Sequence, residues 1–170
     1  EERKTRRGRV CGEFPKCDVA KGIPRGLVSA AISRDTEPTQ FGPTIWGVEV
    51  ARFGADASAL CKRKGNAITE PIRLWRNLDT MQLTGAIKAE YDSCLEKPTE
   101  IFVDAIGLGA GVADRLRELN FPAYAINVSE SPAMGHHSLN LRAEIWYKAK
   151  SWTHGRNIRL PKAETLKKAL

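Results

Sequence analysis

Two acidic residues lie within apolar segments, where a charged side chain needs a specific reason. Glu49 follows Ile45 and Val48 in one segment, and Asp104 ends the apolar run 101–103 in another. A buried carboxylate is unfavourable unless it is paired with an opposite charge or bound to a cation. Two carboxylates that lie close together also repel each other, and a divalent cation relieves that repulsion.

Such a pair suits hard divalent cations, because Mg²⁺ and Mn²⁺ prefer carboxylate oxygen and water as ligands. Two such ions about 4 Å apart can activate a water and stabilise the departing 3′-oxygen of a phosphodiester. The competing interpretations are an outward-facing Glu49 on a half-exposed strand, and Asp104 as a turn or helix-capping residue. The pair therefore indicates either a metal site for phosphodiester cleavage or two acids with ordinary structural roles.

Four further charged residues are candidates for a supporting role. Asp56 is an accessory metal ligand or an ordinary turn aspartate, and Arg52 is a phosphate contact or a surface arginine. Arg142 and Glu144 open a segment that ends in basic sequence. Glu144 and Lys148 also have the spacing of a surface ion pair on a helix. Adjacent histidines at 136 and 137 cannot easily face one metal and are not taken as ligands.

The elements that must position these residues begin with three predicted strands. Residues 44–51 alternate and are rich in β-branched and aromatic types, which is typical of a strand. Residues 57–64 and 67–75 are predicted to follow as strands, with Gly65-Asn66 as the turn between them. Tight turns between short strands indicate an antiparallel meander.

The apolar spacing then changes to that of helices alternating with short strands. Asp79 and Gln82 have the spacing of a capping box at a helix start. The later segments are predicted as a helix over 80–96, a strand over 100–105, a helix over 110–119, a strand over 123–128, a helix over 139–153 and a last helix from near Ala163.

Helix-connected strands are normally parallel, because the connection returns the chain to the same end of the sheet. The pattern therefore predicts an α/β domain with a ribonuclease-H-like, mixed five-stranded sheet, three strands antiparallel and two parallel, flanked by helices. We place this domain at residues 44–170. Residues 1–43 carry many prolines and glycines and are interpreted as a linker, with a short helix near 26–33. In the predicted sheet, the two acids lie on neighbouring strands.

Charge is distributed unevenly along the 170 residues, whose formal net charge is +7. Residues 1–16 hold six Lys/Arg against three Glu, and residues 141–170 hold eight against two, around a slightly acidic middle. Basic flanks could hold a polyanion while acids of the middle hold cations, or they could simply aid solubility. No apolar run is long enough to span a bilayer. The four cysteines form no Cys-x-x-Cys pair, which argues against a zinc site.

A glycine turn at Gly107, Gly109 and Gly111 offers an alternative function. It follows a predicted strand and opens a helix, as in a dinucleotide-binding unit. However, Val112 stands where that motif has its third glycine, and the preceding meander does not suit a doubly wound fold. No Gly-Lys-Ser/Thr phosphate-binding loop occurs, so the segment contains no ATPase motif.

Several of these segments resemble one family in order along the chain. The run Gly47-Val-Glu-Val-Ala-Arg-Phe-Gly-Ala-Asp56 resembles the opening strand of phage terminase large-subunit nucleases, usually GVDVARFGDD. The run Phe102 to Val112 is similar to their second acidic strand, often FVDEIGVGAGV. Asn140-Leu-Arg-Ala-Glu-Ile-Trp146 is similar to their NxRAExW helix, and Gly12-Glu-Phe-Pro15 to the linker that follows the packaging ATPase domain. Each match is weak alone, and the four together are specific.

The resemblance implies an endonuclease that cuts concatemeric double-stranded viral DNA with Mg²⁺ or Mn²⁺, in the host cytoplasm. Glu49 and Asp104 would be catalytic metal ligands, Asp56 an accessory acid, and Arg52, Arg142 and Glu144 DNA-contacting or supporting residues. It also implies an upstream packaging ATPase domain, a small terminase subunit and a portal ring as partners, and no membrane.

The sequence departs from the family at two points. The family usually has Asp where Glu49 stands, and the longer side chain could shift the metal. Its last acidic ligand lies on a C-terminal helix, in a run like SPDLADAL that does not occur before Leu170. We therefore expect a truncated domain with its third ligand beyond Leu170, and weak or absent metal binding and cleavage. A junction-resolving nuclease of the same fold and an inactive DNA-binding fragment are the alternatives.

Overall fold

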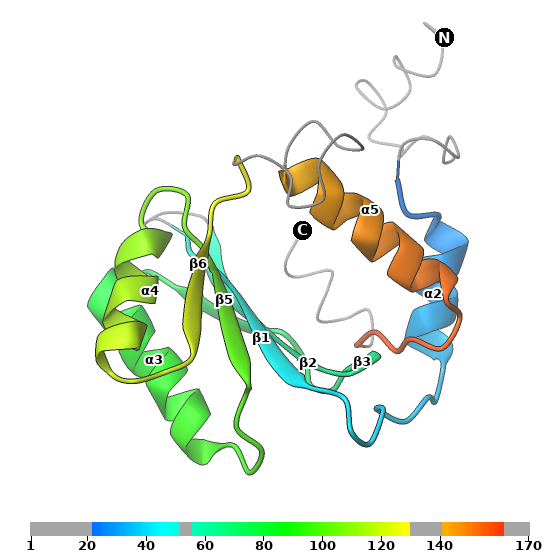
Figure 1. Cartoon of the computed structure of the whole chain (residues 1–170), viewed down its shortest axis with the longest axis horizontal. Coiled ribbons are helices and arrows are strands. Elements are labelled where there is room, and N and C mark those ends of the chain that lie inside the picture. Colours follow the sequence, from blue (N-terminus) through cyan, green and yellow to red (C-terminus); the bar gives the residue numbers. More distant parts are fainter. Residues whose placement is uncertain (1–21, 52–55, 130–140, 162–170) are drawn as a thin grey trace, which may run out of the picture.

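The computed structural model describes residues 22–51, 56–129 and 141–161, and within them a mixed sheet of six strands forms the centre of the molecule (Figure 1). Along the sheet the order is β3-β2-β1-β5-β6, and β4 also pairs with β2. The strands are β1 (Thr44–Glu49), β2 (Ala57–Lys64), β3 (Ala67–Ile68), β4 (Arg73–Arg76), β5 (Glu100–Asp104) and β6 (Ala123–Ile126).

The antiparallel half of the sheet differs from the prediction in one respect. Strand β1 pairs antiparallel with β2, as expected for a meander. The single strand predicted over 67–75 is wrong, because two shorter strands, β3 and β4, both pair with β2. Pro71 lies between them and has no N–H to donate to a sheet, which explains the interruption. The predicted five-stranded sheet therefore has six strands.

The second half of the sheet is parallel, as predicted for strands joined by helices. Strand β1 pairs in parallel with β5, and β5 with β6. Helix α3 (Thr80–Ser93) connects β4 to β5, and helix α4 (Gly109–Glu118) connects β5 to β6. The capping box predicted at the start of α3 is present, since Asp79 accepts a hydrogen bond from the Gln82 N–H and the Gln82 side chain accepts one from the Asp79 N–H.

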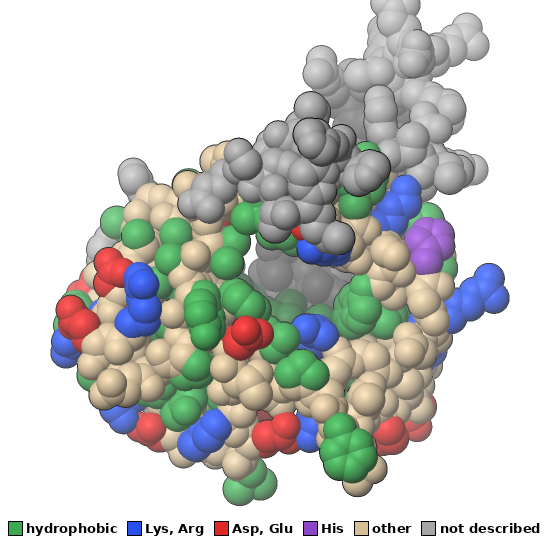
Figure 2. Space-filling view, viewed as in Figure 1, with side chains coloured by type: hydrophobic (Ala, Val, Ile, Leu, Met, Phe, Trp, Pro, Cys, Tyr) green, Lys and Arg blue, Asp and Glu red, His purple; other side chains and the backbone are tan. Residues whose placement is uncertain are grey.

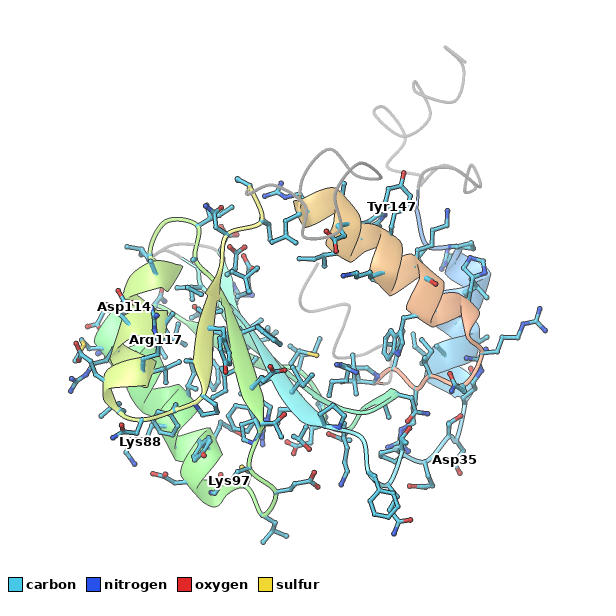
Figure 3. All side chains as sticks on the ribbon, in the orientation of Figure 1. Asp35, Lys88, Lys97, Asp114, Arg117 and Tyr147 are labelled. Carbon is cyan, nitrogen blue, oxygen red and sulfur yellow. The ribbon has the colours of Figure 1, made fainter. Side chains whose placement is uncertain are left out.

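Helices α3 and α4 cover one face of the sheet and enclose the hydrophobic core with it (Figure 1). The sheet contributes alternate residues of β1 and β5, among them Trp46, Val48, Ile101 and Val103. The helices contribute Leu83, Ile87, Val112 and Leu116. Figure 3 shows Lys88, Asp114 and Arg117 on these helices and Lys97 past the end of α3, in the connection to β5.

A buried lysine ties α3 to the sheet on this same face. The side chain of Lys62, on β2, is only 7% exposed, and its Nζ lies 2.8 Å from a carboxylate oxygen of Glu90 and 3.0 Å from one of Glu70. Burial lowers the pKa of Lys62, but the hydrogen bonds and charges of these two acids raise it more, so the net pKa is above the usual value. The lysine is therefore charged and paired inside the fold.

A second helical layer, α2 (Arg25–Ser33) and α5 (Leu141–His154), lies on the other side of the sheet (Figure 1). The two helices contact each other, and the Leu160 N–H donates to the Ala31 carbonyl at 3.1 Å. Tyr147 projects from α5 away from the sheet (Figure 3). The helix predicted from Ala163 lies outside the described residues. Within the part that is described, no helix is both long and apolar enough to cross a bilayer.

Candidate metal centre

Glu49 and Asp104 occupy equivalent positions at the ends of two neighbouring strands. Glu49 is the last residue of β1 and Asp104 the last residue of β5. The two strands run in parallel with Val48 opposite Val103, so the next residue on each strand is an acid. Neighbouring strands lie roughly 4.8 Å apart, which brings the two backbones close at this edge.

Both acids also point to the same face of the sheet. Side chains alternate along a strand, and Trp46, Val48, Ile101 and Val103 are buried toward α3 and α4. Glu49 and Asp104 therefore project from the opposite face, the one turned toward α5. Figure 2 shows hydrophobic side chains over β5 and β6 on this side. The two acids therefore share one edge and one face of the sheet, and the metal ligation predicted for them stays a prediction.

The electrostatics of the pair fit a cation site. Glu49 is exposed to solvent and Asp104 is half-buried, so Glu49 faces outward as one interpretation of the sequence expected. The desolvation that remains at Glu49 raises its pKa, the negative charge of Asp104 raises it further, and the positive charge of Arg142 lowers it. The two carboxylates are thus close enough to repel, and a divalent cation held between them would relieve that repulsion. All donor atoms are carboxylate oxygens, the type that Mg²⁺ and Mn²⁺ prefer.

The turn after β5 fixes the orientation of Asp104. One carboxylate oxygen of Asp104 accepts a hydrogen bond from the Ile106 N–H at 3.0 Å. Gly107 has a φ of 72°, a conformation that favours glycine. A Cβ on Gly109 would lie 1.7 Å from the Asp104 carbonyl oxygen and 3.5 Å from Cγ2 of Val50. Gly109 therefore lets α4 start directly against the ends of both acid-bearing strands.

Solved nuclease domains from two phages share this arrangement of strands and helices. The nuclease domain of the large terminase subunit gp2 of bacterial virus Sf6 is 18% identical, with a TM-score of 0.60 over 84% of this chain and 74% of that chain. The large terminase nuclease of thermophilic phage G20c is 12% identical, with a TM-score of 0.63 over 88% and 78%. The chain has the fold of a phage terminase nuclease domain.

The terminase-nuclease fold is ribonuclease-H-like, and it agrees with the fold class expected from the sequence. The G20c domain was solved with bound magnesium, and a mutant of the Sf6 domain with manganese and beta-thujaplicinol. No protein-family model and no curated protein matches the sequence.

The dinucleotide alternative loses its structural basis. It needs a doubly wound parallel sheet, whereas β2 pairs antiparallel with β1, β3 and β4. The backbone itself requires two of the glycines, because Gly107 forms a left-handed turn and Gly109 closely approaches the Asp104 carbonyl. A Cβ on Gly111 would meet nothing within 4 Å, so no local contact requires this glycine.

The remaining candidate residues occupy different places. Asp56 is exposed immediately before β2, and Arg52 lies outside the described residues. Arg142 is exposed in the first turn of α5, where its N–H donates to the Val128 carbonyl at 3.0 Å. Glu144 forms the expected pair with Lys148 at 2.6 Å, but this is not a surface pair, because Glu144 itself is buried.

Among residues 22–51, 56–129 and 141–161, no group of three or more His, Cys, Asp or Glu side chains is placed to hold a metal ion. The candidate centre therefore consists of two carboxylates in the described part of the chain. Two cysteines there, Cys61 and Cys94, are free thiols, and Cys11 and Cys17 lie outside it.

Two groups that hold the acid-bearing segments in place were not predicted from the sequence. The buried hydroxyl of Ser58 accepts a hydrogen bond from the Ala51 N–H at 3.0 Å and so anchors the chain two residues after Glu49. The Ile106 N–H orients Asp104, and a backbone group leaves no trace in the residue types. Ser58 could have been noticed, because it shares the buried face of its strand with Leu60 and Lys62.

Proposed function

We propose that this chain is the nuclease domain of a viral DNA-packaging terminase and cuts concatemeric double-stranded DNA by metal-dependent phosphodiester hydrolysis. The observation that carries the proposal is the acid pair at the adjoining ends of β1 and β5, on a terminase-nuclease fold. The proposal includes an upstream packaging ATPase domain, a small terminase subunit and a portal ring as partners, and action in the host cytoplasm.

Glu49 and Asp104 would hold the Mg²⁺ or Mn²⁺ through their carboxylate oxygens. When bound, such ions make a water more acidic and stabilise the charge that develops on the leaving 3′-oxygen. The chain's own contribution is positional: the Ile106 N–H holds one oxygen of Asp104, and the Ser58 hydroxyl holds the backbone beyond Glu49. Arg142 supplies positive charge at the same edge, where a DNA phosphate would lie.

The residue type at position 49 also bears on the strength of this activity. Because a Glu stands where the similar sequences usually have Asp, we expect weak metal binding and slow cleavage. Asp56 remains the proposed accessory acid, and Arg52 and Glu144 remain proposed supporting residues.

The proposal is tested by metal binding and cleavage measured together. Millimolar Mn²⁺ should raise the melting temperature of the wild-type chain, because an ion that binds only the folded state stabilises it. The rise should be lost in Asp104→Asn and Glu49→Gln. Slow nicking of supercoiled plasmid should require Mn²⁺ and vanish in the same variants, whereas Glu49→Asp should retain or increase it.

Different outcomes contradict different parts of the proposal. A wild-type chain that neither gains stability from Mn²⁺ nor nicks plasmid would contradict the nuclease proposal and favour an inactive DNA-binding fragment. Fast nicking that depends on Glu49 would show that the expectation of weak activity is wrong. Preference for four-way junctions over linear duplex would favour a junction-resolving nuclease.

A further inference from the structure

Two large apolar side chains project into solvent from the turn that follows Asp104. Ile106 is 46% exposed and Leu108 is 40% exposed, and Gly107 between them is exposed as well. Single exposed apolar residues are common on protein surfaces. Here two of them share one three-residue turn, and that turn is continuous with a proposed metal-binding strand.

This turn is held firmly in relation to the acid pair. The Ile106 N–H is hydrogen-bonded to the Asp104 carboxylate at 3.0 Å, and Gly107 turns the chain through a left-handed conformation. Helix α4 starts at Gly109, packed against the Asp104 carbonyl. The backbone that carries the exposed side chains of Ile106 and Leu108 is therefore held next to the acid pair, where a scissile phosphate would bind.

We propose that Ile106 and Leu108 form an apolar contact to the base pairs of duplex DNA, next to the phosphate that is cut. This inference rests on the proposed function and adds a second kind of DNA contact to it. Metal ions and Arg142 would attract the phosphate backbone by charge, and an apolar contact to the bases would add an attraction that does not depend on charge. Isoleucine and leucine are among the side chains that proteins place against base steps in the minor groove.

Salt dependence separates such a contact from a charge contact. Each phosphate neutralised by Lys or Arg makes the slope of log affinity against log salt steeper by about 0.9, whereas an apolar contact does not change this slope. Binding is measured by fluorescence anisotropy of a labelled short duplex over a series of salt concentrations. Ca²⁺ replaces Mn²⁺ because it also binds carboxylate oxygens, and gels verify that the DNA stays intact.

The double variant Ile106→Ala, Leu108→Ala should bind duplex roughly tenfold more weakly at every salt concentration, with the slope unchanged. Arg142→Ala should instead reduce the slope. Leu95→Ala is the matched control, because Leu95 is fully exposed and follows α3 near the opposite ends of the strands. Its binding should equal that of the wild type.

Several results would overturn the inference, and they differ from failure of the proposed function. A double variant that binds like the wild type, or whose slope becomes shallower, removes the apolar contact while leaving the nuclease proposal intact. A wild-type chain that does not bind duplex DNA at all would contradict both the apolar contact and the proposed function. Thermal melts check folding, and the conservative pair Ile106→Val, Leu108→Met should retain most of the affinity if the contact is apolar.

Discussion

At Glu49, desolvation and two charged neighbours together set the pKa of the carboxyl group. Burial raises the pKa of this carboxyl, the charge of Asp104 raises it further, and Arg142 opposes both. A raised pKa means that the folded state disfavours the charged carboxylate relative to the unfolded chain. Without a bound cation, Glu49 therefore destabilises the fold at neutral pH, and this contribution is absent at low pH, where the group is protonated in both states.

Glu49→Gln should accordingly raise the melting temperature in EDTA at neutral pH. The gain should disappear as the pH falls below about 4, the usual range of an unfolded Glu. It should amount to at most about 1 kcal/mol, because the side chain is exposed and solvent screens its charge. Thermal unfolding of both proteins over a pH series measures the difference.

A double-mutant comparison assigns the cause of this effect. In an Asp104→Asn background the stabilisation by Glu49→Gln should shrink, because the charge that repels Glu49 has been removed. An unchanged gain in that background would mean that the two carboxylates do not interact, and it would contradict the cation site at the ends of β1 and β5.

At the scale of the element, the turn from β5 into α4 decides how the acid pair is held. Its glycines are not equivalent. Gly109 touches the Asp104 carbonyl, whereas a Cβ on Gly111, two residues into the same helix, would meet nothing within 4 Å. Sequence alone presents both as parts of one glycine-rich motif, and only the packing of α4 against β5 distinguishes them.

Opposite effects are expected from the same substitution at these two glycines. Gly109→Ala should destabilise the fold by about 3 kcal/mol, because its Cβ forces α4 away from Asp104. Gly111→Ala should stabilise it by up to about 1 kcal/mol, since alanine has a higher helix propensity than glycine. Urea unfolding measures both, and a stable Gly109→Ala protein with unchanged Mn²⁺ binding would show that the close approach is not needed.

At the scale of the whole molecule, the acid pair lies on two interior strands of the sheet that the described residues form. Strands β1 and β5 each have a hydrogen-bonded neighbour on both sides, whereas β6 ends the sheet. The same two strands supply Trp46, Val48, Ile101 and Val103 to the core. The candidate site therefore sits on rigid backbone, which favours a fixed spacing between its carboxylates.

Hydrogen exchange should show that the interior strands of the sheet open less readily than its edge strands. Amides of β1 and β5 should exchange only on global unfolding, whereas those of β4 and β6 should exchange faster through local opening. Exchange followed by mass spectrometry on peptides from each strand provides the measurement. Equal or greater protection in β6 would contradict the view that the central strands form the stable unit that carries the site.

The sequence by itself determined the types and order of most elements, because alternation and helical spacing are local properties. It predicted α2, the capping box of α3, the parallel β5–β6 pair, and the two acids on neighbouring strands, although the first strand ends at Glu49 and not at residue 51 as predicted. The third strand was predicted as a single element, although Pro71 within it was a visible reason to divide it.

Only the tertiary structure decided which groups surround the acids. Glu49 and Asp104 are separated by more than fifty residues, so their shared face depends on the register of β1 against β5. The burial of Glu144, the approach of Arg142 to Glu49 and the contact of Gly109 with Asp104 all arise from packing between distant segments. Such contacts depend on the relative placement of whole elements, and the spacing of residues along the chain does not encode that placement locally.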